Sequence, residues 1–136
     1  MSQIVNSPFT FVGGSDFGAI YRPYVFVSVY SKFTNSWRDV RMVVDSGADY
    51  TLLPKKYAAI LGIDLEKECV YNSSQGIGGE EKICFYKNLP VKIKNWETKI
   101  PVGFILRNSI PPLLGRAGCL EALKVIFEKR RTVFEN

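Results

Sequence analysis

The feature that most constrains this chain is a succession of short runs of β-branched and aromatic residues, each ended by glycine, proline or small polar residues. Such runs are typical of strands, and the residues between them are typical of turns. Pro54 and Gly62 bracket a short helix over 55–61, and a second short helix is expected near 116–122. Strands are expected at 9–12, 24–30, 38–44, 51–53, 69–86, 89–94 and 98–106, with a final hairpin of 124–127 and 132–134. Many short strands with one or two short helices indicate a mostly-β fold, closed or sandwich-like.

The length of 136 residues fits one domain, and we expect a single unit over 1–136 with residues 1–18 as a loosely ordered N-terminal extension. The formal net charge is +5, which alone would favour an anionic partner. The basic residues are scattered, however, and no nucleic-acid-binding motif accompanies them. We therefore expect no nucleic-acid partner.

The start of the chain shows no leader pattern, and nowhere do 18 apolar residues run together. Cys69, Cys84 and Cys119 are odd in number and widely spaced, so they form neither a disulfide framework nor a metal knuckle. They are interpreted as buried thiols that act as small hydrophobes. The expectation is a soluble, cytoplasmic protein that does not bind membranes.

The chain contains no histidine. This excludes Ser/His and Cys/His nucleophile pairs, the common zinc ligand sets and acid/base chemistry by imidazole. If the protein is an enzyme, carboxylates are the residues expected to perform the chemistry, and no metal or cofactor is expected.

One carboxylate has an unusual setting, because Asp45 directly follows the apolar run Met42–Val44 and begins the small-residue turn Asp45-Ser46-Gly47. This order places an acid at the mouth of a buried strand. An Asp-Ser-Gly tripeptide alone is weak evidence, so its context decides. Asp16 also lies among small residues, but no apolar run leads into it, and we interpret it as a loop residue.

Further features accompany this turn: Ala48-Asp49 directly after it, a glycine-rich hairpin tip at 76–79, and Leu113-Leu114-Gly115-Arg116 near the end of the chain. Together they resemble the retropepsin-like aspartic peptidases, in particular small single-domain prokaryotic members. The resemblance extends from about Tyr24 to Phe134. It implies a small closed β-barrel-like acid protease fold that acts as a homodimer.

The resemblance also implies roles for individual residues. Asp45 would be the catalytic carboxylate, the Ser46 hydroxyl would bond across to the partner's matching loop, and Gly47 would leave room for the substrate backbone. Residues implied to bind the substrate are Ala48 and Asp49 in the groove and Gly76, Ile77, Gly78 and Gly79 in a flap. Residues implied to support the catalytic turn are Leu113, Leu114, Gly115 and Arg116, with Arg116 pairing with Asp49.

Physical chemistry gives independent reasons for these residue types. Hydrolysis by an activated water needs one group that takes a proton and one that donates a proton. Two carboxyls about 3 Å apart supply both, because they share one proton. The chain offers a single Asp-Ser-Gly turn, and a two-fold homodimer would place each Asp45 opposite its copy.

The leading hypothesis is therefore a homodimeric aspartic endopeptidase in which an Asp45 dyad activates water to cleave a peptide or protein substrate. Extended substrate segments with apolar side chains, and mildly acidic pH, should suit it. One alternative is a non-catalytic peptide-binding or dimerisation module on the same fold. A second is a processing domain released from a larger polyprotein.

Overall fold

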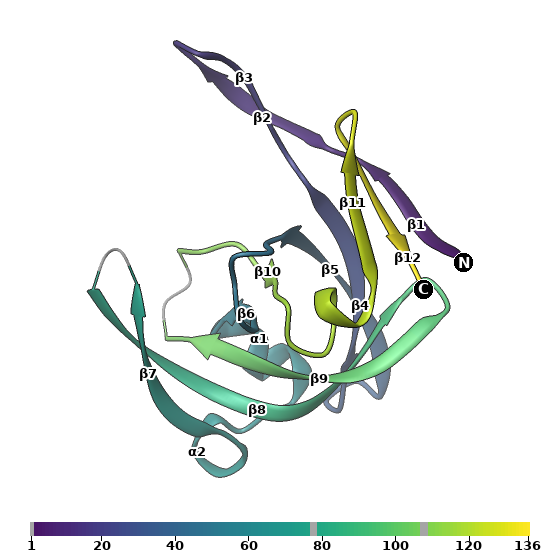
Figure 1. Ribbon diagram of the computed structural model, residues 1–136. Coiled ribbons are helices and arrows are strands. Elements are labelled where there is room, and N and C mark those ends of the chain that lie inside the picture. Colours follow the sequence, from purple (N-terminus) through teal and green to yellow (C-terminus); the bar gives the residue numbers. More distant parts are fainter. Residues whose placement is uncertain (1, 77–78, 107–108) are drawn as a thin grey trace.

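The computed structural model describes residues 2–76, 79–106 and 109–136, and its regular structure is mostly β. Figure 1 shows a curved sheet wrapped around a central core, with a long hairpin projecting from it. The strands are β1 (Gln3–Pro8), β2 (Thr10–Ser15), β3 (Gly18–Arg22), β4 (Tyr24–Ser31), β5 (Ser36–Val44), β6 (Thr51–Pro54), β7 (Val70–Gly76), β8 (Gly79–Ile93), β9 (Trp96–Ile105), β10 (Leu113–Leu114), β11 (Lys124–Glu128) and β12 (Arg131–Glu135). The helices are α1 (Lys56–Leu61), α2 (Leu65–Glu68) and the single 3-10 turn η1 (Leu120–Ala122).

The main sheet closes into a barrel. Its strands follow the order β4-β5-β10-β6-β9-β8-β7, and an additional pairing of β4 with β8 joins the two ends of a six-stranded ring that leaves out β7. Most neighbours are antiparallel, but β10 runs parallel to β5 and β6 runs parallel to β9. Closure removes the exposed edges that an open sheet of this size would present.

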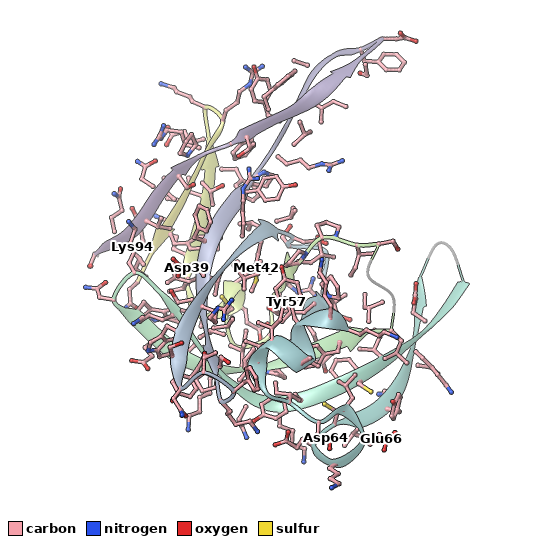
Figure 2. All side chains as sticks on the ribbon, turned by 180° about the vertical axis from the view of Figure 1, so that it is seen from behind. Asp39, Met42, Tyr57, Asp64, Glu66 and Lys94 are labelled. Carbon is pink, nitrogen blue, oxygen red and sulfur yellow. The ribbon has the colours of Figure 1, made fainter. Side chains whose placement is uncertain are left out.

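The core lies inside this ring and follows the alternation of the strands. Val25, Val27 and Val29 of β4 are buried, whereas Phe26 between them is exposed. On β5, Met42 is fully buried inside the barrel and Asp39 lies on the outer surface (Figure 2). Alternation with a period of two is what a sheet with one buried face requires, and it fixes which side of β5 faces the core.

Two smaller sheets lie outside the barrel. Strands β1, β12 and β11 form a three-stranded sheet that brings the two chain ends side by side, with Gln3 opposite Glu135. Strands β2 and β3 form a separate two-stranded hairpin, which projects from the barrel in Figure 1. In the structure, residues 3–8 pair with β12 near the end of the chain, and residues 10–15 pair with β3.

Two expectations need correction, and one helix was not expected. The segments expected as separate strands at the end of 69–86 and at 89–94 form one strand, β8, whose register shifts between Tyr86 and Leu89. The helix expected near 116–122 is only the 3-10 turn η1. Helix α2 was not expected at all, although its N-cap Asp64 accepts hydrogen bonds from the backbone N–H groups of Glu66 and Lys67, a common start signal.

The barrel core sets the stability of the molecule. Leu53 on β6 is fully buried and lies beside Phe104 of β9, so Leu53→Ala should lower the free energy of unfolding by about 2–5 kcal/mol through lost burial and a residual cavity. Urea unfolding followed by tryptophan fluorescence measures this. Val70→Ala removes an apolar side chain that is 62% exposed and should change stability by no more than about 0.5 kcal/mol. Equal losses in the two variants would contradict this placement of the core.

Candidate active site

The turn that follows β5 holds Asp45 in a defined position. The Asp45 backbone N–H donates to the carbonyl oxygen of Leu114 at 2.9 Å, and the carboxylate oxygen Oδ1 accepts from the N–H of Gly47 at 3.0 Å. Within the described part of the chain, the second carboxylate oxygen, Oδ2, accepts no hydrogen bond. The half-buried carboxyl group is thus fixed through one oxygen while the other is free for a further partner.

Glycine at position 47 suits this arrangement. A Cβ at Gly47 would lie 3.3 Å from Oδ1 of Asp45, tighter than ordinary van der Waals contact. The turn is also closed by the N–H of Ala48, which donates to the carbonyl oxygen of Asp45 at 3.1 Å. A small residue therefore lets the backbone amide approach the carboxylate closely.

The segment that contains β10 supports the turn from below. Leu113 and Leu114 pair in parallel with Val43 and Val44 of β5. The next residue, Gly115, is buried, and a Cβ there would lie 2.3 Å from the carbonyl oxygen of Tyr50. No side chain fits in that space without moving the backbone, so glycine is required.

Thr51 was not singled out from the sequence, yet it links the same two segments. Its side chain is fully buried, and its hydroxyl accepts a hydrogen bond from the Gly115 N–H at 3.1 Å. This bond satisfies a buried amide that would otherwise lack a partner. The sequence signal was only a threonine at the start of a short apolar run, which is equally common in ordinary strands.

Arg116 fastens the outer side of the turn. Its backbone N–H donates to the carbonyl oxygen of Ala48 at 3.0 Å, and its guanidinium Nη1 donates to the carbonyl oxygen of Ser46 at 2.6 Å. The same guanidinium forms an ion pair with Asp49, so the expected pairing of these residues is confirmed. Because both side chains are substantially exposed, the ion pair positions the turn more than it stabilises the fold.

A groove of about 380 Å³ lies directly beside the turn. Gly47, Ala48 and Asp49 form one wall, and Asn72 and Ser73 of β7 contribute to the other. Its apolar lining comes from Tyr50, Leu52, Ile83 and Phe85. The rings of Tyr50 and Phe85 pack edge to face with centroids 5.0 Å apart. The sequence analysis missed these four residues, which only the pairing of distant strands brings together.

The expected flap corresponds to the hairpin of β7 and β8. These strands pair from Val70 opposite Phe85 up to Gly76 opposite Gly79. Ile77 and Gly78 lie outside the described residues. Figure 1 shows this hairpin extending past the end of the barrel on which the β5–β6 turn lies.

The two cysteines with shifted pKa values are poor nucleophiles. Burial raises the pKa of the Cys119 thiol to about 12 and that of Cys69 to about 11, so neither forms a reactive thiolate near neutral pH. Across residues 2–76, 79–106 and 109–136, no cluster of carboxylate and thiol side chains could hold a metal ion. The same residues contain no helix that is long and apolar enough to span a membrane.

Comparison with known proteins agrees with this geometry. Residues 32–117, more than half of the chain, match a family model described as "Aspartyl protease". The crystal structure of a retropepsin-like aspartic protease from Rickettsia conorii superimposes with a TM-score of 0.65 at 24% sequence identity, and the match covers 98% of this chain and 95% of that one. No curated protein sequence matches. The chain therefore belongs to the aspartyl protease family, as an aspartic-type endopeptidase, and it has the fold of a retropepsin-like aspartic protease.

The contact between Gly115 and the Tyr50 backbone gives a direct test of how the site is held. Gly115→Ala should lower the free energy of unfolding by about 1–3 kcal/mol, because the added methyl group forces the two segments apart. It should also lower kcat/KM by roughly 10²-fold, since the turn that carries Asp45 moves with them. Thermal unfolding and peptide hydrolysis measure the two effects.

The matched control for stability is Gly14→Ala, because a Cβ at Gly14 meets no atom within 4 Å. Its free energy of unfolding should stay within about 0.5 kcal/mol of the wild-type value. If Gly115→Ala lowered the free energy of unfolding no more than Gly14→Ala does, the close packing described for Gly115 would be refuted.

Proposed function

We propose that the enzyme is a homodimer in which Asp45 from each subunit contributes one carboxyl group to a single catalytic dyad. The observation that carries this proposal is the state of the Asp45 carboxylate, whose Oδ1 is held by the Gly47 N–H while Oδ2 has no hydrogen-bond partner in the described residues. The chain contains one Asp-Ser-Gly turn. A two-fold axis beside this turn would supply the second carboxyl group without a second lobe.

Ser46 supports the same arrangement. It is exposed, and its carbonyl oxygen is taken by Arg116, while its hydroxyl makes no hydrogen bond within the described residues. The hydroxyl is therefore available to bond to the matching turn of the partner. A serine hydroxyl can both donate and accept, so two symmetric turns can bond to each other reciprocally.

The dyad would act as base and acid in one reaction. One carboxylate takes a proton from a water molecule while the water oxygen attacks the peptide carbonyl carbon. The other carboxyl group, which is protonated, donates its proton to the carbonyl oxygen. The tetrahedral intermediate then breaks its C–N bond: the nitrogen receives the proton that the first carboxyl group took from water, and the other carboxylate takes a proton from a hydroxyl of the intermediate. No covalent bond to the enzyme forms, and the roles of the two carboxyls exchange.

The substrate proposed for this site is a peptide or protein segment in extended form. The groove combines apolar side chains, such as Leu52 and Ile83, with the backbone of the β7–β8 hairpin. Extended peptides bind well between such elements, because main-chain hydrogen bonds give affinity and side pockets select alternate side chains. Apolar residues of the substrate should therefore be preferred on the side that faces Tyr50 and Phe85.

Asp45→Asn tests the catalytic role of this side chain. The amide is nearly the same size but cannot accept a proton, so kcat with an unfolded protein substrate should fall by a factor of about 10²–10⁴ or more. The dimer should persist in sedimentation analysis. Asp39→Asn is the control, because Asp39 lies on the outer surface of β5 and accepts a hydrogen bond from the Ser28 hydroxyl; its kcat should equal that of the wild type. A non-catalytic binding module would show no hydrolysis to lose.

Subunit mixing tests whether the dyad is shared. A fixed amount of wild-type enzyme, fully dimeric and exchanging subunits, is mixed with an equal amount of Asp45→Asn protein. If both carboxyls are needed in one site, random pairing leaves only about half of the wild-type chains in active dimers, so the rate should fall by about half. A rate that stays unchanged would show that each subunit works alone and would overturn the shared dyad.

The single-domain organisation over 1–136 and the cytoplasmic location remain predictions from the sequence. The three cysteines are free thiols in the structure, which supports a reducing environment.

A further inference from the structure

The hairpin formed by β2 and β3, which we call the arm (residues 10–22), has features that neither the barrel nor the catalytic turn explains. In the described residues its two strands pair only with each other. A two-stranded hairpin on its own is only marginally stable in water. Something else is therefore expected to cover it.

The arm is well anchored at its root. The Arg41 guanidinium donates to the Thr10 hydroxyl at 2.7 Å and stacks over the Tyr24 ring at 3.9 Å. Arg130 stacks over the Tyr21 ring at 4.0 Å. These contacts fix the direction in which the arm leaves the barrel.

The arm carries exposed apolar side chains from its root to its tip. Phe17 lies in the tip turn and is 100% exposed, although turns of this kind favour small or polar residues. Phe11 and Ile20 are also exposed. The turn itself is ordered, because the Ser15 hydroxyl accepts from the Phe17 N–H and donates to the Gly18 carbonyl oxygen. The phenyl ring is thus presented outward on a defined support, and such clusters of apolar side chains mark interaction surfaces.

A groove of about 470 Å³ lies at the root of the arm. Its lining is mainly apolar and aromatic, and includes Pro8, Tyr24 and the exposed Phe26. Arg41 stands at its side. This volume is within the range of pockets that bind small apolar groups.

We propose that the arm clasps a second copy of this chain, with Phe17 of each subunit inserted into the root groove of the other. This inference rests on the proposed homodimer and names a surface that would hold it together. In Figure 1 the arm leaves the barrel on the side on which β5 leads into β6, the side on which a partner must lie if two Asp45 side chains are to meet.

Symmetry and charge favour a second copy over another partner. In the proposed dimer the two-fold axis is perpendicular to the arms, so the two arms run in opposite directions and the tip of one lies at the root of the other. The tip carries the acid Asp16 and the root carries the bases Arg22 and Arg41. Within the described residues none of these three forms an ion pair. The arm is therefore complementary to itself in both charge and apolar surface.

The test is Phe17→Ser, with sedimentation velocity to measure the dimer Kd and peptide hydrolysis to measure activity against enzyme concentration. Each dimer loses two buried phenyl rings, each worth about tenfold or more in affinity, so the Kd should rise by about a hundredfold. The concentration at half-maximal activity should rise by the same factor. The rate per site at saturating enzyme should stay the same, since Phe17 is remote from the catalytic turn.

The matched control is Phe33→Ser, because Phe33 is 76% exposed on the turn between β4 and β5 and lies outside the arm and its groove. Its dimer Kd should remain within about twofold of the wild-type value. A Phe17→Ser dimer as tight as that of Phe33→Ser would overturn the clasp. If the wild type still forms dimers and loses half its rate on mixing with Asp45→Asn, the shared dyad would survive that failure. A wild-type enzyme that is active as a monomer would contradict both the clasp and the shared dyad.

Discussion

The site depends on the hydrogen bond that the Asp45 backbone donates to Leu114. Residues 45 and 114 are far apart in the chain, and this bond joins the end of β5 to the two-residue strand β10 inside the closed barrel. Closure of the barrel holds β10 between β5 and β6. The Asp45 carboxyl group, which we propose as the catalytic group, is thus positioned by backbone contacts within the closed barrel.

The same segment controls the turn from two directions. Gly115 packs against the backbone below it, and Arg116 holds the carbonyl oxygens of Ser46 and Ala48 above it. The rest of the groove lining comes from β8, a strand of the barrel, and from β7, which pairs with β8. A single short segment therefore connects core packing to the orientation of the Asp45 turn, so we expect that disturbing it would affect stability and activity together.

The sequence predicted the elements whose signal is local. Each of these signals is contained in a few neighbouring residues. They are the alternation in β4 and in β5, the proline and glycine around α1, and the Asp-Ser-Gly turn. The strand expected at 9–12 overlaps the start of β2, but the rest of the arm was missed because Gly13, Gly14, Gly18 and Ala19 give it no alternating pattern. Strand β10 is too short to show any pattern. The groove residues Tyr50 and Phe85 could not be joined from sequence, because their contact depends on pairing between strands distant in the chain.

In the proposed dimer, the second carboxyl group of the site belongs to another copy of the chain. It therefore cannot be found in the sequence or the structure of one subunit. The most direct measurement is a crystal structure of the assembled enzyme with a bound substrate-like peptide. The account predicts a two-fold dimer in which carboxyl oxygens of the two Asp45 side chains lie within hydrogen-bond distance, about 3 Å, of each other. An active assembly in which these two carboxyl groups are far apart would contradict it.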